Sequence, residues 1–190
     1  MDLIIVTDRL DSAQPLMEAA SEYGHRLLKV IGINDSAKKF VSSLLPDVLI
    51  FISNEVDRPL LREMHSVNEA QPTPMIVFTS DSGDEAIYAA VKAGATAFIV
   101  DCSDPSRLGS LLGVAKARFE EQQRLIDELQ QTKSALQERK SVERAKGIIM
   151  KSKRLSEDEA YKAMRKLAMN HNKRIGEIAE QIISASEVLI

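Results

Sequence analysis

The sequence has few of the residues from which catalytic, metal and disulfide sites are usually built. Cys102 is its only cysteine, so no disulfide can form within the chain and no cysteine-rich metal site exists. The three histidines, His25, His65 and His171, are scattered and lack the spacing of metal ligands. No glycine-rich phosphate-binding loop occurs. We therefore expect neither an enzyme nor a bound metal or cofactor.

Long hydrophobic runs are also absent. No segment reaches the length of about 20 apolar residues that a membrane-spanning helix needs. The N-terminal residues MDLIIVTD contain too short an apolar run for a signal peptide and lack a basic start. The simplest expectation is a cytoplasmic protein with no membrane contact.

Charge is unevenly distributed along the 190 residues. Residues 1–138 hold 13 Lys and Arg against 21 Asp and Glu, a net charge of −8. Residues 139–190 hold 12 against 7, a net charge of +5. A basic C-terminal part predicts contact with an anion such as nucleic acid. The alternatives are that the two parts attract each other, or that the Lys and Arg side chains only solvate helix surfaces.

Strand and helix patterns alternate through residues 1–118. The strands are expected at residues 3–6, 25–33, 47–53, 75–80 and 96–100, and the helices between them near 15–24, 36–45, 60–70 and 84–94. Three of the strand segments are apolar almost without interruption, which is typical of strands buried on both faces of a parallel sheet. We predict a doubly wound, flavodoxin-like α/β domain with a five-stranded parallel sheet.

A long helix is expected after this domain, because neither Pro nor Gly occurs from Val114 to Arg144. Residues on one side of this helix recur at alternating spacings of four and three, as in the seam of a heptad coiled coil, and polar residues flank them. We predict that residues 119–138 form a parallel coiled coil between two copies of the chain. The alternative is a single long helix that packs on its own protein. The seam residues are Ala115, Phe119, Gln122, Ile126, Leu129, Lys133 and Leu136, of which Phe119, Ile126, Leu129 and Leu136 are the expected dimer contacts.

Three apolar helical stripes occupy residues 139–190. The first continues the long helix through Ala145, and the third begins near Ile175. Between them, Ser156 with Glu159 three residues later predicts the capped start of a second helix. Fifty residues form only a marginal core, so we expect this small three-helix domain to gain stability from the dimerising helix before it.

Four motifs mark the strands of the N-terminal domain: IIVTD, PDVLIFIS, IVFTS and AGATAFIV. With these motifs, residues 1 to about 118 resemble the receiver domains of two-component response regulators. The resemblance implies a carboxylate at the end of the third strand that accepts a phosphoryl group, and acidic residues after the first strand that hold a divalent cation. It also implies a hydroxyl and a lysine that contact the phosphoryl group.

Most of these groups are missing at the matching positions. The acidic pair is reduced to Asp8, and the hydroxyl survives as Thr79. The acceptor position falls on Ile52, with Ser53 next, and the lysine position falls on Asp101. An isoleucine cannot accept a phosphoryl group and a carboxylate cannot replace a cation. The resemblance therefore indicates a pseudo-receiver, controlled by protein contact rather than by phosphorylation.

One alternative keeps a carboxylate in place. Counting back from Pro59 puts Glu55 at the acceptor position, which implies a small insertion before it. Glu55 would then be a permanent negative charge rather than a phosphoryl acceptor. Asp57 lies further into the loop and is the weaker candidate.

The C-terminal residues carry a second set of motifs, Ala145-Lys146-Gly147, Glu159-Ala160, Ala168-Met169 and Ile178-Ala179 in this order. With them, residues 139–190 resemble an ANTAR domain, the RNA-binding module of transcription-antitermination response regulators. The whole chain is similar to the nitrate-assimilation (NasT-like) members of that family. The resemblance implies a dimer that binds tandem hairpins in leader RNA and prevents a terminator from forming. It also implies a possible partner, a ligand-sensing protein that holds the regulator inactive.

Basic side chains in this part are the candidate RNA contacts. Gly147 is predicted in mid-helix, where it costs about 1 kcal/mol relative to alanine, and its bare backbone lets another helix or a nucleotide approach. Tyr161 could stack on a base, but packing is the simpler expectation for a single tyrosine in a helix. The candidate RNA-binding residues are Lys146, Gly147, Lys151, Arg165, Lys166, Lys173 and Arg174.

Two other functions fit the same pattern. Three helices on a dimerising domain could form a helix-turn-helix that binds DNA half-sites, although the residues MNHNKR between the second and third helices lack a tight glycine turn. A dimeric adaptor whose basic end binds an acidic protein is the other alternative.

Overall fold

A computed structural model describes residues 1–101 and 105–188 of the chain. Cys102 lies outside these described residues. The chain divides into two compact units, Met1–Gln123 and Arg124–Ile190, and each is described by itself below. Within the described parts, no helix is both long and apolar enough to cross a bilayer.

The first unit contains a five-stranded parallel sheet in the order β2-β1-β3-β4-β5. Strands β1, β3 and β4 in the middle are buried along almost their whole length, whereas the edge strands β2 and β5 are partly exposed. The uninterrupted apolar segments therefore lie where they were predicted, and the doubly wound α/β fold is confirmed. The strands are β1 (Asp2–Thr7), β2 (Arg26–Gly32), β3 (Val48–Ile52), β4 (Met75–Thr79) and β5 (Ala97–Val100).

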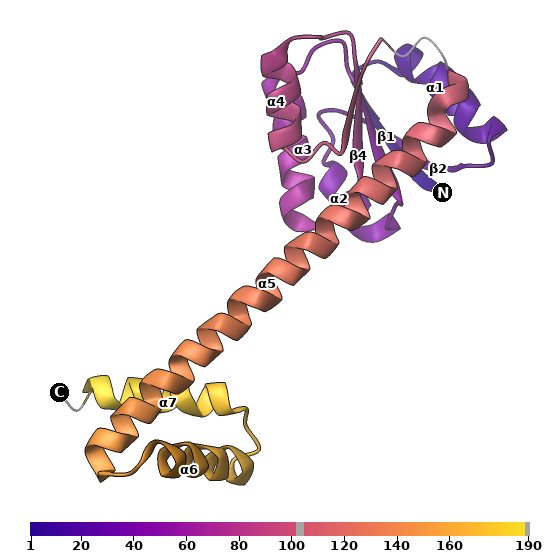
Figure 1. Cartoon of the computed structure of the whole chain (residues 1–190). Helices are drawn as coiled ribbons and strands as arrows, with labels where there is room; N and C mark the ends of the chain where they lie inside the picture. The colour runs from indigo at the N-terminus through magenta and orange to yellow at the C-terminus, as the bar shows by residue number, and fades with distance from the viewer. Residues whose placement is uncertain (102–104, 189–190) are drawn as a thin grey trace. The chain divides into compact units, whose positions relative to one another are not determined.

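Helices cover both faces of the sheet (Figure 1). One face packs against α1 (Leu10–Glu22) and the start of α5 (Leu108–Lys153). The other packs against α2 (Ala37–Leu44), α3 (Arg58–Ala70) and α4 (Asp84–Lys92). A short 3₁₀ helix, Pro105–Arg107, precedes α5.

Helix α1 starts earlier than predicted. It begins at Leu10 rather than at Pro15, which lies inside the helix. Proline lacks only one backbone donor, and the burial of Ala13 and Leu16 on the core side supports the turns around it.

Helix α5 is one continuous helix of 46 residues, as the absence of Pro and Gly from Val114 to Arg144 predicted for its middle part. Ala115, predicted in the coiled-coil seam, is instead fully buried in the core of the first unit. The correction has a simple cause, because the same four-and-three spacing serves a core helix and a coiled coil. Ile126, Leu129 and Leu136 remain 38%, 54% and 53% exposed. The coiled coil itself stays a prediction.

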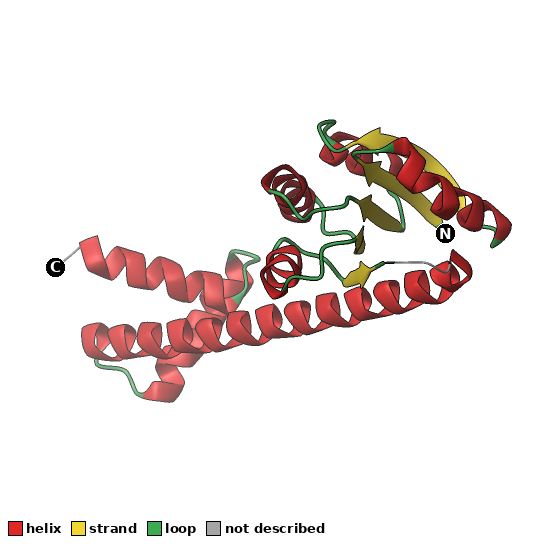
Figure 2. Cartoon of the chain, turned by 90° about the horizontal axis from the view of Figure 1, so that it is seen from above, coloured by secondary structure: helices red, strands yellow, loops and turns green. Residues whose placement is uncertain are grey.

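The second unit packs the end of α5 against α6 (Glu157–Asn170) and α7 (Ile175–Val188), as Figure 2 shows. Its core is small and is built mostly from alanine and isoleucine. This is the small three-helix domain predicted from the apolar stripes.

Two neighbouring residues of α5 test which face of this helix supports the sheet. Leu112 is fully buried, whereas Val114 is 51% exposed. We expect Leu112→Ala to lower the free energy of unfolding of the first unit by about 2–5 kcal/mol, because it leaves a cavity. Val114→Ala should change it by less than about 0.5 kcal/mol. Urea unfolding followed by circular dichroism measures both, and equal losses would contradict the assigned face.

Candidate functional site

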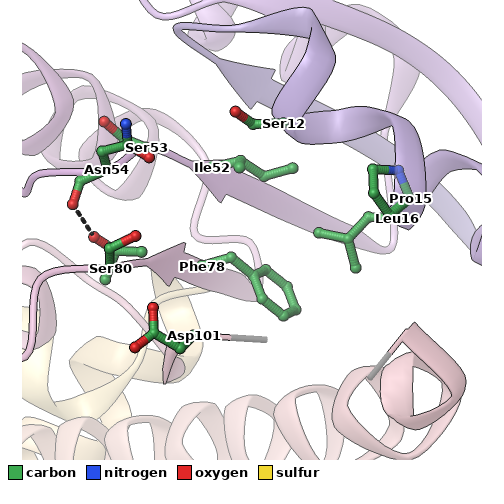
Figure 3. A pocket seen from close by; sticks show the side chains of 10 residues that line it. Ser12, Pro15, Leu16, Ile52, Ser53, Asn54, Phe78, Ser80 and Asp101 are labelled. Carbon is green, nitrogen blue, oxygen red and sulfur yellow. Dashed lines mark hydrogen bonds between the residues drawn. The ribbon is translucent and has the colours of Figure 1, made fainter. Parts of the chain in front are cut away.

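The carboxyl ends of β3 and β4 border a cavity of about 340 Å³. Figure 3 shows its two sides, an apolar one with Leu16, Ile52 and Phe78 and a polar one with Ser53, Asn54, Ser80 and Asp101. The three apolar side chains belong to the buried core of the first unit. Among the described residues that line the cavity, none is Lys or Arg.

The predicted pseudo-receiver residues gather at this edge of the sheet. Ile52 is buried at the end of β3 and pairs in register with Thr7 of β1. Ser53 Oγ donates a hydrogen bond to a carboxylate oxygen of Asp8 at 3.1 Å. Thr79 Oγ1 donates to the carbonyl of Asn54 at 3.0 Å. The strand end that carries the acceptor carboxylate in receivers thus holds an aliphatic side chain.

The two acidic alternatives lie in the loop after β3. Glu55 is exposed and borders a second hollow together with Asp8 and Ser53. Asp57 has a structural role, since its carboxylate accepts the backbone N–H of Leu60 at 3.0 Å and caps α3. Within residues 1–101 and 105–188, no three His, Cys, Asp or Glu side chains cluster closely enough to hold a metal ion.

The second unit owes its compactness to small residues at the helix contacts. Ala145 of α5, Ala160 and Met164 of α6, and Ala179 of α7 are fully buried together. Alanines let the three helix backbones approach closely and keep long side chains on the outside. The Lys and Arg side chains of the unit are therefore left on its surface, with one exception described below.

The turn between α5 and α6 is tightly specified. Arg154 adopts a left-handed conformation with φ of 51°, and the predicted capping box follows. The Ser156 N–H donates to Glu159 Oε2 at 2.9 Å, and the Glu159 N–H donates to Ser156 Oγ at 3.4 Å. The Ser156 hydrogen bonds lower the pKa of the Glu159 carboxyl.

The turn between α6 and α7 places two more candidate residues. Asn172 is left-handed with φ of 52°, and the Lys173 N–H closes the end of α6 by donating to the Ala168 carbonyl at 2.9 Å. The Arg174 N–H donates to Glu177 Oε2 at 2.7 Å at the start of α7. Both basic side chains are exposed.

Lys146 is the exception among the basic residues. It is only 8% exposed, and its Nζ lies 2.7 Å from Glu157 Oε1 and 2.9 Å from Glu143 Oε1. The hydrogen bonds to Glu157 and Glu143 raise the pKa of Lys146, and the same contact lowers the pKa of Glu157. Lys146 thus joins the end of α5 to the first turn of α6. Its predicted contact with RNA remains a prediction, but the structure gives it a local role that sequence reasoning missed.

The other basic candidate residues are exposed, and no nearby carboxylate balances their positive charge. Within the described residues, none of the five side chains concerned has a carboxylate within 4.0 Å. Lys151 lies one turn after Gly147 and so shares its face of α5. Arg165 and Lys166 lie on the outer side of α6. The five residues are Lys151, Arg165, Lys166, Lys173 and Arg174.

Gly147 is open. A Cβ atom built on it would meet no heavy atom within 4 Å. Within the described residues, no other helix packs closely against this mid-helix glycine, and its contact with RNA stays a prediction. Gly176 of α7 is the opposite case, since a Cβ there would lie 2.7 Å from Cγ of Glu138.

The ion pair of Lys146 predicts an acid-sensitive second unit. Because the pKa of Glu157 is lowered in the folded unit, its ionised carboxylate stabilises the fold fully above pH 4.5, the ordinary pKa of a glutamate. This stabilisation is lost as the pH falls through the lower folded-state pKa. We expect Lys146→Met to lower the unfolding midpoint of this unit at pH 7, and to make the further fall on acidification smaller than in the unmodified chain. Thermal unfolding by circular dichroism from pH 7 to 3 measures both.

Lys166→Met is the matched control, because Lys166 is exposed and has no carboxylate partner among the described residues. It should leave the midpoint and its pH dependence unchanged. An equal effect of the two substitutions would show that the loss of any positive charge, rather than this ion pair, is responsible.

Comparison with known proteins agrees with this geometry. The ANTAR domain family matches residues 130–183. The transcriptional regulatory protein PdtaR of Mycobacterium tuberculosis is 25% identical over 181 residues, which are 95% of this chain and 88% of that protein. The nitrate regulatory protein of Klebsiella oxytoca is 38% identical over 74 residues, 39% of this chain and 19% of that protein.

Solved structures of other proteins share the fold of the first unit. The signal receiver domain of a modulated diguanylate cyclase from Desulfovibrio desulfuricans matches 64% of this chain and 97% of its own, with a TM-score of 0.55 and 18% identity. That likeness concerns the fold alone. Residues 130–183 of the chain thus match the ANTAR domain family, and the unit before them has the fold of signal receiver domains.

Proposed function

We propose that this regulator binds hairpins in leader RNA through its C-terminal unit and thereby prevents a transcription terminator from forming. The proposal depends on five exposed cations without carboxylate partners among the described residues, namely Lys151, Arg165, Lys166, Lys173 and Arg174. Unpaired cations on a compact unit attract phosphates and release counterions on binding. The ANTAR match of the same residues supports RNA as the source of those phosphates.

Two copies of the unit would act together. The exposed apolar side chains of Ile126, Leu129 and Leu136 lie along α5 at the spacing of a coiled-coil seam. A dimer joined there presents two RNA-binding units to two adjacent hairpins. Binding of the second hairpin then becomes intramolecular, so a tandem RNA binds much more tightly than either half.

The receiver-like domain would control this pairing without phosphorylation. Its strand end holds Ile52 in place of an acceptor, and Asp8 and Thr79 are already hydrogen-bonded to neighbours. A protein partner that senses a ligand and contacts this domain could hold the regulator inactive. Binding of such a partner to this domain would compete with formation of the active dimer, and this competition would need only reversible binding.

A salt-controlled titration tests the proposal. The ligands are an RNA with two adjacent hairpins, each hairpin alone, and duplex DNA of the same sequence. We expect the tandem RNA to bind at least ten-fold more tightly than either half, and DNA to bind weakly. Arg165→Ala should weaken RNA binding and reduce the slope of log K against log salt by about 0.7–0.9, if one phosphate contact is lost.

The double variant Ile126→Asn, Leu129→Asn is the control for dimerisation. It should bind single hairpins normally and lose the preference for the tandem RNA. Equal or tighter binding of DNA would instead favour a DNA-binding regulator. Salt-dependent binding to no nucleic acid would favour the dimeric adaptor.

Gly147 provides a test in which stability and binding change in opposite directions. Gly147→Ala should raise the free energy of unfolding by about 0.5–1 kcal/mol, because alanine favours the helix and meets no neighbour. If RNA approaches the bare backbone beside Lys151, the same methyl group weakens hairpin binding. Urea unfolding and RNA titration measure the two effects.

Gly113→Ala is the matched control. Gly113 lies on the same helix, in the first unit, and a Cβ atom there also meets nothing within 4 Å. It should give a similar gain in stability with no change in RNA binding. Unchanged binding by Gly147→Ala would remove Gly147 from the interface.

A further inference from the structure

The cavity at the carboxyl ends of β3 and β4 has the position and the size of a small-molecule site. Its volume of about 340 Å³ lies near the lower end of the range for ligand pockets. The strand order reverses between β1 and β3, and α1, which follows β1, lines the cavity. In open α/β sheets, ligands bind beyond the carboxyl ends of the strands at such a point. The proposed RNA binding by the second unit makes no use of this cavity.

The apolar side of the cavity is part of the core of the first unit. Leu16 of α1, Ile52 of β3 and Phe78 of β4 are each less than a tenth exposed. Figure 3 shows the Leu16 side chain directed toward the other two. All three residues belong to a helix or to a buried strand, so this wall is held in place by the fold. An apolar group that enters the cavity leaves water without having to open the core.

The polar side offers mainly hydrogen-bond acceptors. The hydroxyl groups of Ser53 and Thr79 already donate, to Asp8 and to the carbonyl of Asn54, so these two hydroxyls can only accept from a ligand. Asp101 adds a carboxylate, which accepts several hydrogen bonds at once. Among the described residues that line the cavity, Asp101 is the one acidic residue and none is basic.

The backbone fixes Asp101 beside the end of β4. Its N–H donates to the Thr79 carbonyl at 3.0 Å, which extends the pairing of β5 with β4. Asp101 then adopts the left-handed conformation, with φ of 47°, which Asp and Asn tolerate better than most residues. Asp101 stands where the receiver resemblance expects a lysine. The charge at this edge of the sheet is therefore reversed, and the cavity attracts cations and repels phosphate.

The neighbouring hollow around Glu55 is different in kind. Among the described residues, charged, amide and hydroxyl side chains alone line it, namely Asp8, Arg9, Ser53, Asn54, Glu55 and Asp57. Water satisfies such side chains as well as a ligand does. The cavity beside Ile52 combines an apolar side with a few polar groups, as sites for small organic ligands do.

We propose that this cavity binds a small organic amine, with its ammonium group at Asp101 and its apolar body against Leu16, Ile52 and Phe78. The ammonium donates charge-assisted hydrogen bonds to the carboxylate, and a hydroxyl oxygen on the same side accepts a further one. A branched aliphatic or aromatic body fills the apolar side. Such a ligand gives the receiver-like domain a chemical input that needs no phosphoryl transfer.

Four probes test the proposal by NMR titration of the full-length protein. 2-Phenylethylamine has both groups, 2-phenylethanol lacks the charge, phenylacetate reverses it, and ethylamine lacks the apolar body. 2-Phenylethylamine should bind at least about ten-fold more tightly than each of the others, and should shift the amide signals at the ends of β3 and β4. 3-Methylbutylamine should show the same preference over 3-methylbutanol. If neither amine binds more tightly than its alcohol, the proposal is wrong.

Two variants separate the charge from the space. Asp101→Asn keeps the shape of the side chain and suits the left-handed backbone. It should weaken 2-phenylethylamine binding at least about ten-fold and leave the weaker binding of 2-phenylethanol unchanged. Ser12→Phe, at an exposed residue of α1 that lines the cavity, should block both ligands. Amine binding that survives Ser12→Phe would lie elsewhere and would contradict the site.

Asp84→Asn is the matched control for charge, because Asp84 is exposed and is not among the residues that line the cavity. It should leave amine binding unchanged. Equal losses in Asp101→Asn and Asp84→Asn would show that the amine responds to the general negative charge of this unit, and would overturn the assignment. None of these outcomes depends on whether the second unit binds RNA.

Discussion

The unbroken hydrogen bonding of α5 is the constraint on which both compact units depend, because each takes part of its core from this helix. Leu108 and Leu112 belong to the first core, and Ala145 and Ile149 belong to the second. Between them, residues 124–140 are all exposed. This stretch gains little beyond its backbone bonds and surface pairs such as Arg124 with Glu128, and an isolated helix of such length is marginal in water. A second helix along the seam would remove Leu129 and Leu136 from water, so the proposed dimerisation would also stabilise this helix.

The two units are stabilised in different ways. The first buries three central strands completely and can tolerate polar residues at the strand ends, where Ser53 and Thr79 satisfy their hydroxyls locally. The second has only a few alanines, isoleucines and one fully buried methionine to bury. Its shape depends on the ends of its helices and the turns between them, which hold a capping box, two residues in the left-handed conformation and the Lys146 ion pair. Its basic surface is therefore carried by a unit whose turns, more than its core, determine its shape.

Much of the fold follows from local patterns, and much of the surface does not. Uninterrupted apolar segments predicted the central strands, and the Ser156–Glu159 spacing predicted the start of α6, because each reports a preference of its own segment. The positions of Lys146 and Tyr161 depend on how α6 is rotated against α5, which no periodicity specifies. The partner of Lys146 is eleven residues away across a turn, and only the acidic first turn of α6 hinted at it. Gly147 shows the same limit, since a pattern places it in a helix without saying what faces it.

The isoleucine at the end of β3 has a consequence for timing. A receiver that accepts a phosphoryl group stores its signal in a covalent bond, and the lifetime of that bond sets how long the response outlasts the stimulus. Ile52 offers no atom that could form one. Under the proposed control by contact alone, the domain would have no chemical memory: its output would follow the concentration of its partner and would reset as fast as that partner dissociates.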